Sequence, residues 1–154
     1  MIDFAIRFIF VCGVDTLFTM CLIFILSFNK KITAKDVLTW LALNSISYYL
    51  QTLSFLYVFI DIIFYYFIFK LFYIHTKKLL SSIFLSFTIL ATITALIYSP
   101  IILAFNLDTN SIYNNTIYLL IIRIPLIIAE IFILILIRRK KKNENRRILN
   151  KTRQ

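Results

Sequence analysis

Residues 116–137 read TIYLLIIRIPLIIAEIFILILI, and residues 138–154, RRKKKNENRRILNKTRQ, follow them directly. The first stretch has the roughly 20 apolar residues that a helix needs to cross a hydrocarbon layer of about 30 Å. The second stretch holds nine Lys or Arg residues against one acid, Glu144. Because Lys and Arg resist translocation and are attracted to anionic headgroups, we expect this end of the chain on the cytoplasmic side of a membrane.

The composition of the whole chain supports a membrane protein. Of the 154 residues, 61% are hydrophobic, and there are one Gly and two Pro. A soluble domain of this length has too small a core to bury that much apolar surface. The net charge is +10, and the last 17 residues contribute nine positive charges and one negative charge, which leaves +2 for the other 137. The sequence therefore predicts an apolar membrane body with a cationic tail.

Five segments are candidate transmembrane helices. Four are strongly apolar, and the fifth, residues 32–51, is shorter and carries Asn44, Ser45, Ser47 and Gln51. The expected spans are approximately residues 4–28, 32–51, 53–74, 79–105 and 116–137. The first span lacks a basic start and a small-residue cleavage site, so we expect it to be retained rather than removed as a signal peptide.

The distribution of charge between these segments indicates the topology. Basic residues follow the span 4–28 and the span 53–74, whereas the loop 106–115 carries Asp108 and no basic residue. If residues 32–51 cross the membrane, every basic junction faces the cytoplasm, as the positive-inside rule requires. We therefore predict an all-α, polytopic membrane helix bundle of about five transmembrane helices, residues 1–137, with the N-terminus outside, and a cytoplasmic basic tail, residues 138–154.

Ionisable residues inside the spans are the best candidates for a functional site, because each costs at least about 2.5–3.5 kcal/mol at the membrane centre. At 1.5 Å per residue, Asp61 and Arg123 both lie about 10–12 Å from the outer ends of their helices. Their equal depth predicts an intramembrane ion pair, with Asp15 close enough in depth to compete. Such a pair can either lock the bundle or form a site that a ligand or partner perturbs.

Two other charged residues are possible members of this site. Glu130 follows Arg123 by seven residues on the same helix face, where it could bind Lys70. Lys70, however, points to the opposite side of its helix from Asp61, so we expect it to reach the inner headgroups instead. Pro125 removes a backbone hydrogen bond close to Arg123, so we expect a bend there.

The basic tail is expected to bind anionic lipid. It begins at the membrane surface and lacks the interleaved aromatic residues of a nucleic-acid site, so no nucleic-acid partner is expected. Its residues could also continue the last helix into the cytoplasm. The residues expected to face lipid are Arg138, Arg139, Lys140, Lys141, Lys142, Arg146 and Arg147.

The chain carries no pattern that indicates catalysis. It has a single His, no acid or second His at a metal-ligand spacing from it, and one Gly, which excludes a glycine-rich phosphate loop. No Ser or Cys has a base at a recognisable spacing. We therefore expect a protein that is not an enzyme and that holds no metal and no cofactor.

The order of features resembles the membrane sensor region of peptide-pheromone-sensing histidine kinases of Gram-positive bacteria. The resemblance is carried by NKKIT after the first span (residues 29–33), a polar second span, an aromatic third span that ends in FKLF (69–72), a polar outer loop (106–115), and Arg123 before a basic exit. It covers about residues 1–142. It implies binding of a secreted peptide at outer loops and transmission through the last helix. The chain ends at Gln154 without phosphoacceptor or nucleotide-binding domains, so it would act through a partner.

Three functions follow as hypotheses. The first is a receptor-like sensing module that acts through a partner protein. The second is a small accessory or immunity-type subunit of a larger membrane complex, and the third, a transporter, is disfavoured because the spans show no internal repeat. We expect partners among membrane lipids and either another membrane protein or further copies of the chain. The expected location is a bacterial plasma membrane, with an organellar inner membrane as the alternative.

Overall fold

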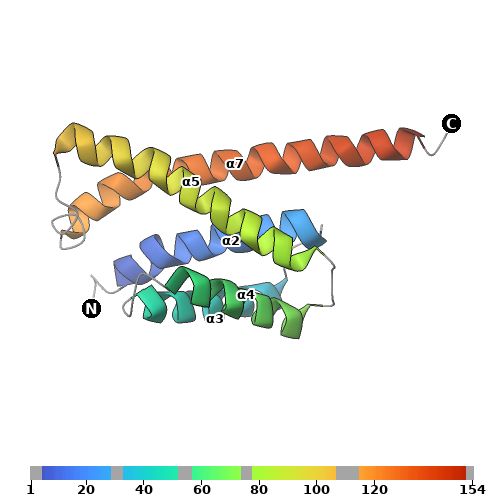
Figure 1. Cartoon of the computed structure of the whole chain (residues 1–154), viewed down its shortest axis with the longest axis horizontal. Coiled ribbons are helices and arrows are strands. Elements are labelled where there is room, and N and C mark those ends of the chain that lie inside the picture. The colour runs from blue at the N-terminus through green and yellow to red at the C-terminus, as the bar shows by residue number, and fades with distance from the viewer. Residues whose placement is uncertain (1–4, 29–32, 52–56, 74–77, 107–114, 152–154) are drawn as a thin grey trace.

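The computed structural model describes residues 5–28, 33–51, 57–73, 78–106 and 115–151, and over these residues the chain is helical (Figure 1). The first helix is continuous but changes type twice, from the π-helix η1 to the α-helix α2 and then to the π-helix η2. The prediction of an all-α bundle is confirmed. The bounds are η1 Arg7–Gly13, α2 Val14–Ile23, η2 Phe24–Phe28, α3 Ala34–Gln51, α4 Tyr57–Phe72, α5 Leu79–Phe105 and α7 Thr116–Lys151.

The five helices run alternately up and down. In Figure 1 the first helix, α4 and α7 point toward one end of the bundle, and α3 and α5 point toward the other. The first helix packs against α3, α5 and α7, whereas α4 packs against α3 and α5. Half of the apolar part of the first helix is buried, against 22% for α5 and for α7. The first helix is therefore the centre of the bundle.

Two apolar clusters hold the helices together. One joins the middle and end of the first helix to α3, α4 and the start of α5 through buried residues that include Ile23, Leu43, Phe69 and Ile83. The other joins the first helix to α5 and α7 through Phe18, Leu22, Ile93 and Leu126. Both clusters include residues of the first helix, which accounts for its central place.

Helix α3 turns four of its polar side chains inward, whereas Lys35 and Ser45 are exposed. Asp36, Thr39, Asn44 and Ser47 are all buried, at 4% exposure or less, and each has a hydrogen-bond partner inside the protein. Asp36 accepts a bond from the hydroxyl of Thr33, three residues earlier, which caps the start of the helix. Each of these four side chains therefore makes at least one hydrogen bond inside the protein, although the side-chain oxygen of Asn44 has no partner among the described residues.

Three helices are long and apolar enough to cross a membrane: the first helix over Arg7–Ser27, α5, and α7 over Ile117–Glu144. This confirms the prediction of a membrane-embedded protein. Helix α5 matches the predicted span 79–105. The number of five spans and the orientation of the bundle stay predictions.

Helix α7 extends well past the rest of the bundle. It runs without interruption for 36 residues, about 54 Å, through Pro125 and the predicted tail as far as Lys151. Figure 1 shows it changing direction near its start and then continuing beyond the other helices. The basic residues from Arg138 to Lys151 thus continue the last helix, as the sequence allowed.

Candidate functional site

The candidate site is built around the π-helical segment η1 at the start of the first helix. π-helical segments are rare and occur frequently at functional sites. From the α3 side, the amide nitrogen of Asn44 donates to the carbonyl oxygen of Phe8 at 3.2 Å, and the indole nitrogen of Trp40 donates to that of Gly13 at 3.0 Å. The Cys12 thiol donates in return to the Asn44 carbonyl oxygen at 3.6 Å. Side chains thus tie η1 to α3.

Gly13 permits this close approach between the two helices. A Cβ atom at this position would lie 3.0 Å from the carbonyl oxygen of Phe8, 3.3 Å from the Trp40 ring and 3.4 Å from the Asn44 amide. The distances to the Phe8 oxygen and the Trp40 ring are shorter than ordinary van der Waals contacts. The only Gly of the chain therefore stands where α3 crosses the π-helical segment.

From the opposite side, Arg123 of α7 binds the same segment. Its Nε donates to the carbonyl oxygen of Phe10 at 3.0 Å, and its Nη2 donates to that of Val11 and forms an ion pair with Asp15. The Arg123 side chain is only 3% exposed and that of Asp15 23%. We call Arg123, Asp15 and the two carbonyl groups the Arg123 clamp, because they fasten α7 to the first helix.

Glu130 lies beside the Arg123 clamp on α7. It is 2% exposed, and neither carboxylate oxygen has a hydrogen-bond partner among the described residues. It lies close enough to Asp15 and Arg123 to interact electrostatically with both. The site therefore contains two carboxyl groups and one guanidinium group, and within the described part of the chain the Glu130 carboxyl group has no donor.

The predicted Asp61–Arg123 ion pair is wrong. Arg123 pairs instead with Asp15, the competitor that the sequence also indicated. The reason is the packing of the helices, because α7 lies against the first helix and α5, whereas Asp61 of α4 faces α3. There the buried Asp61 carboxylate accepts a hydrogen bond from the Ser47 hydroxyl at 2.9 Å.

Asp61 nevertheless belongs to the same polar interior. Cys12 of the first helix lies within electrostatic range of Asp15, Asp61 and Arg123. Lys70 does not join them, because it is exposed on α4 and its ammonium group lies 5.6 Å from the centre of the Tyr66 ring. The proposed contact between Lys70 and Glu130 is therefore absent from the described residues.

A second cation of α7 binds the other π-helical segment of the first helix. The Nζ atom of Lys141 donates to the carbonyl oxygens of Ile25 and Leu26, the latter at 3.3 Å. Both acceptors lie in η2. Lys141 was expected to face lipid, and this is corrected: its ammonium group turns toward the protein, where the carbonyl oxygens of Ile25 and Leu26 accept its hydrogen bonds.

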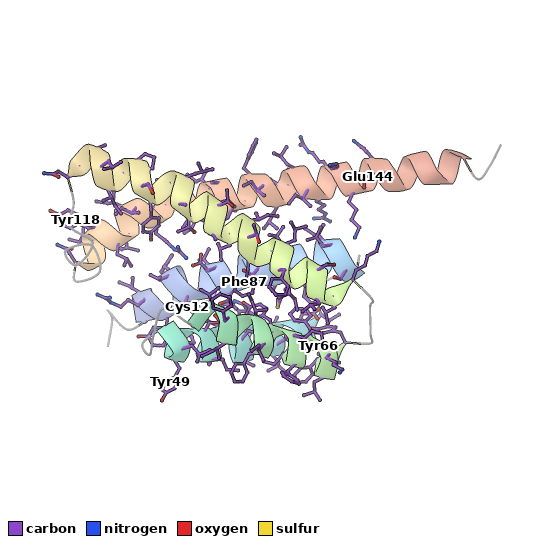
Figure 2. All side chains as sticks on the ribbon, viewed as in Figure 1. Cys12, Tyr49, Tyr66, Phe87, Tyr118 and Glu144 are labelled. Atoms are coloured by element: carbon purple, nitrogen blue, oxygen red, sulfur yellow. The ribbon has the colours of Figure 1, made fainter. Side chains whose placement is uncertain are left out.

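The neighbouring basic residues of α7 have the exposure expected of groups that face lipid or water. Arg138, Arg139, Lys140 and Lys142 are exposed, as is Glu144 on the part of α7 beyond the other helices (Figure 2). The side chains of Arg146 and Arg147 lie outside the described residues. The binding of lipid by this segment stays a prediction.

The sequence did not indicate the role of the first-helix backbone. A comparison of depths in the membrane pairs one charged side chain with another. Arg123 binds two backbone carbonyl groups, and because every residue carries such a group, the sequence does not mark these partners. Gly13 alone could have been noticed from the sequence, because it is the one Gly of the chain and a residue without a Cβ atom permits the close approach of another helix. Trp40 and Asn44 gave no such signal, because their partners are also backbone oxygens.

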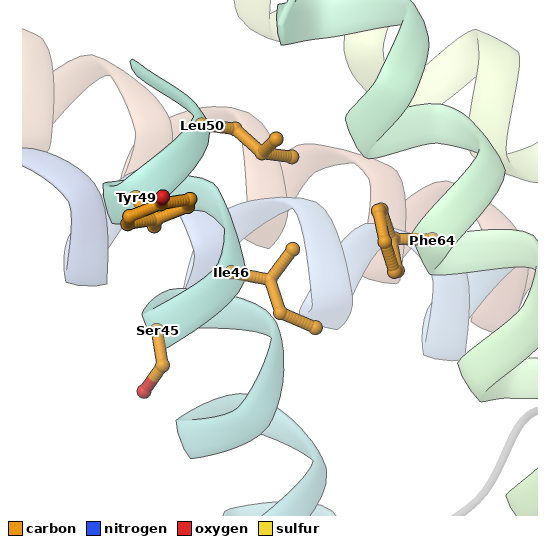
Figure 3. Close-up of a pocket in the computed structure, with 5 residues that line it drawn as sticks. All are labelled: Ser45, Ile46, Tyr49, Leu50 and Phe64. Atoms are coloured by element: carbon orange, nitrogen blue, oxygen red, sulfur yellow. The ribbon is translucent and has the colours of Figure 1, made fainter. Parts of the chain in front are cut away.

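An apolar groove on the outer face of α3 and α4 carries no chemistry of its own. It is lined by Ser45, Ile46, Tyr49 and Leu50 of α3 and by Phe64 of α4. Figure 3 shows Ile46, Leu50 and Phe64 directed into the space between the two helices.

Within the described residues no group of three or more His, Cys, Asp or Glu side chains is placed to hold a metal ion.

Comparison with protein-family models, with curated proteins and with solved structures finds no match for this chain. The resemblance to the sensor region of the histidine kinases therefore stays a prediction. The function has to be argued from the Arg123 clamp and from the helices that it joins.

Proposed function

We propose that this chain is a non-enzymatic, multi-pass membrane protein that works as a receptor-like sensing module through a partner protein. The observation that carries the proposal is α7, one continuous helix that contains the buried Arg123 and, further along, the exposed cations Arg138, Arg139, Lys140 and Lys142. A movement at the clamp is transmitted along a rigid helix to the cytoplasmic surface, where a partner can detect it.

The length of α7 supports this role. The helix is about 54 Å long, and the hydrocarbon layer is about 30 Å thick, so about 24 Å of helix extends into the headgroups and cytoplasm. Arg123 and Lys141 attach it to the first helix at two levels. A change at one attachment therefore alters how the helix leaves the membrane.

The inward polar face of α3 supports five spans. Its buried polar side chains have partners in the protein, and its outer face carries Leu38, Leu41 and Tyr49, which lipid can accept. The alternation of helix directions puts the ends of the first helix and of α4 on the side of the α7 exit (Figure 1), and in the sequence basic residues follow both of these helices. With Lys and Arg on the cytoplasmic side, the N-terminus lies outside.

The outer loop between α5 and α7 is the proposed place for the ligand. It joins the two helices whose apolar surfaces meet Phe18 and Leu22 of the first helix. Residues 107–114 of this loop lie outside the described residues. A peptide bound there would act on the start of α7, less than three helical turns from Arg123.

The exposed cations Arg138, Arg139, Lys140 and Lys142 are proposed to bind anionic headgroups. Each Lys or Arg near an anionic surface contributes about 1 kcal/mol to attraction. This attraction holds the exit of α7 at the inner surface. In the proposed mechanism, a movement of α7 changes how these residues are presented to the partner.

The first test is recovery of the partner. The chain is expressed with an affinity tag in its native host, solubilised in mild detergent, and its companions are identified by mass spectrometry. We expect a kinase or another signalling protein. A Lys141→Ala variant, which loses the attachment of α7 to the end of the first helix, should still recover that protein but alter its activity, whereas Lys70→Gln, an exposed control on α4, should behave as the unsubstituted chain.

A second candidate is an accessory or immunity-type subunit of a larger membrane complex. The open apolar groove between α3 and α4, with Tyr49 65% exposed beside it, favours this alternative because it offers a lateral surface for another transmembrane helix. Recovery of a stoichiometric membrane complex without a signalling protein would support it and would contradict the receptor-like function.

A further inference from the structure

The buried charges at the Arg123 clamp do not balance. Arg123 carries one positive charge, and Asp15 carries the negative charge that pairs with it. Glu130 adds a second carboxyl group that is 2% exposed and has no donor within the described residues. An isolated buried carboxylate has a very high desolvation cost, and a group in this position takes up a proton instead.

Among the residues that the structure describes, Arg123 is the one cation within electrostatic range of Glu130. From the first helix it meets Asp15, with Cys12 nearby; from α7 it meets Arg123; and Tyr98 of α5 lies within electrostatic range of the guanidinium group. From α4, Asp61 and Tyr65 both lie within electrostatic range of Cys12, and Tyr65 also lies within range of Asp15. All of these groups except Arg123 are acidic or neutral, so none can replace Arg123 as the partner of Glu130.

We propose that Asp15 and Glu130 form a binding site for one proton, and that this proton keeps Arg123 on the carbonyl oxygens of Phe10 and Val11. With the proton bound, Glu130 and Asp15 share it in a hydrogen bond, and together they carry one negative charge that Arg123 neutralises. When the proton leaves to water, two carboxylates compete for one guanidinium group, and Arg123 is drawn from the first helix toward Glu130.

This inference goes beyond the proposed function, because it concerns the purified chain and requires no partner. The chain also contains its own reporter. Trp40 is the only Trp, and its indole nitrogen donates to the carbonyl oxygen of Gly13, two residues after Val11. A change in how Arg123 holds η1 therefore changes the environment of a single fluorophore.

The experiment follows Trp emission of the full purified chain in lipid nanodiscs from acidic to alkaline pH. We expect one transition with the steepness of a single proton. Glu130→Gln cannot lose a proton, so this variant should lose the transition and keep the acidic spectrum. Glu144→Gln is the matched control, since it makes the same change at an exposed position of the same helix, and it should retain the transition.

A second measurement guards against a variant that fails to fold. In infrared spectra of the wild-type chain, we expect the carbonyl band of a protonated carboxylic acid to disappear over the same pH range, and Glu144→Gln should leave this band unchanged. The proposal is overturned if the wild type shows neither change, or if Glu130→Gln keeps the transition. It is also overturned if His75→Gln abolishes the transition, or if the midpoint moves with sodium concentration, which would assign the site to sodium.

Discussion

Arg123 is the only buried cation among the residues that the structure describes. It is stabilised by one carboxylate and by two carbonyl groups that already belong to the first helix. A guanidinium group suits this position because its donors are fixed in a planar fork, so it can bind several acceptors at once. A Lys ammonium would not reproduce that geometry.

Replacing Arg123 with Gln should strongly destabilise the bundle. The change leaves the partly buried carboxyl group of Asp15 beside that of Glu130 without a cation, and breaking a buried ion pair costs about 3–5 kcal/mol. We expect a loss of that size in the free energy of unfolding, measured by denaturant titration in mixed micelles. Lys70→Gln, at an exposed position, should change it by less than about 0.5 kcal/mol.

A double substitution tests whether the ion pair is the cause. Adding Asp15→Asn to Arg123→Gln removes the uncompensated charge, so part of the lost stability should return. Adding Asp61→Asn should return none of it, because Asp61 pairs with Ser47 and not with Arg123. Equal recovery by both would contradict the assignment of the pair to Asp15.

The two π-helical segments of the first helix are each bound by a cation of α7. Arg123 binds η1, and Lys141 binds η2, 18 residues further along α7. The first helix and α7 run in the same direction, so these attachments hold both ends of their contact (Figure 1). Together they set the rotation and height of α7 relative to the centre of the bundle.

Lys141→Ala should loosen the end of the first helix without unfolding the protein. The loss of one hydrogen-bonded cation from a half-exposed position costs about 1 kcal/mol. We expect amide exchange in Phe24–Phe28 to become about fivefold faster, as measured by hydrogen–deuterium exchange. Lys142→Ala removes the same charge from the exposed neighbouring position and should leave that exchange unchanged. Equal acceleration in both variants would show a general charge effect.

The extents of the helices could be predicted, but their lateral contacts could not. In a membrane every backbone N–H and C=O group needs a hydrogen-bond partner within the protein, so a long apolar run forms a helix over its whole length. For this reason the predicted span 79–105 agrees with α5. Depth along a helix follows from residue number, and it placed Asp61 and Arg123 level. Which helix lies beside α7 depends on packing of the whole bundle, and this packing brings Asp15 to Arg123.

At the scale of the whole molecule, we compare three topologies that put the tail in the cytoplasm. With five spans, the junction after the first helix is inside and the junction between α3 and α4 is outside. With three spans, formed by the first helix, α5 and α7, both junctions are inside. With four spans, in which α3 does not cross, both junctions are outside. The sides of these two junctions therefore decide the topology.

Single cysteines at these junctions should distinguish the three topologies. In a chain with Cys12→Ala and Cys21→Ala, a membrane-impermeant thiol reagent applied to intact cells should label Thr52→Cys but not Lys31→Cys. Asn110→Cys is the positive control and Lys142→Cys the negative control, because all three topologies place them outside and inside respectively. Labelling of neither junction would indicate three spans, and labelling of both would indicate four. We expect five, because α3 buries Asp36, Asn44 and Ser47 within the protein and presents an apolar outer face to lipid.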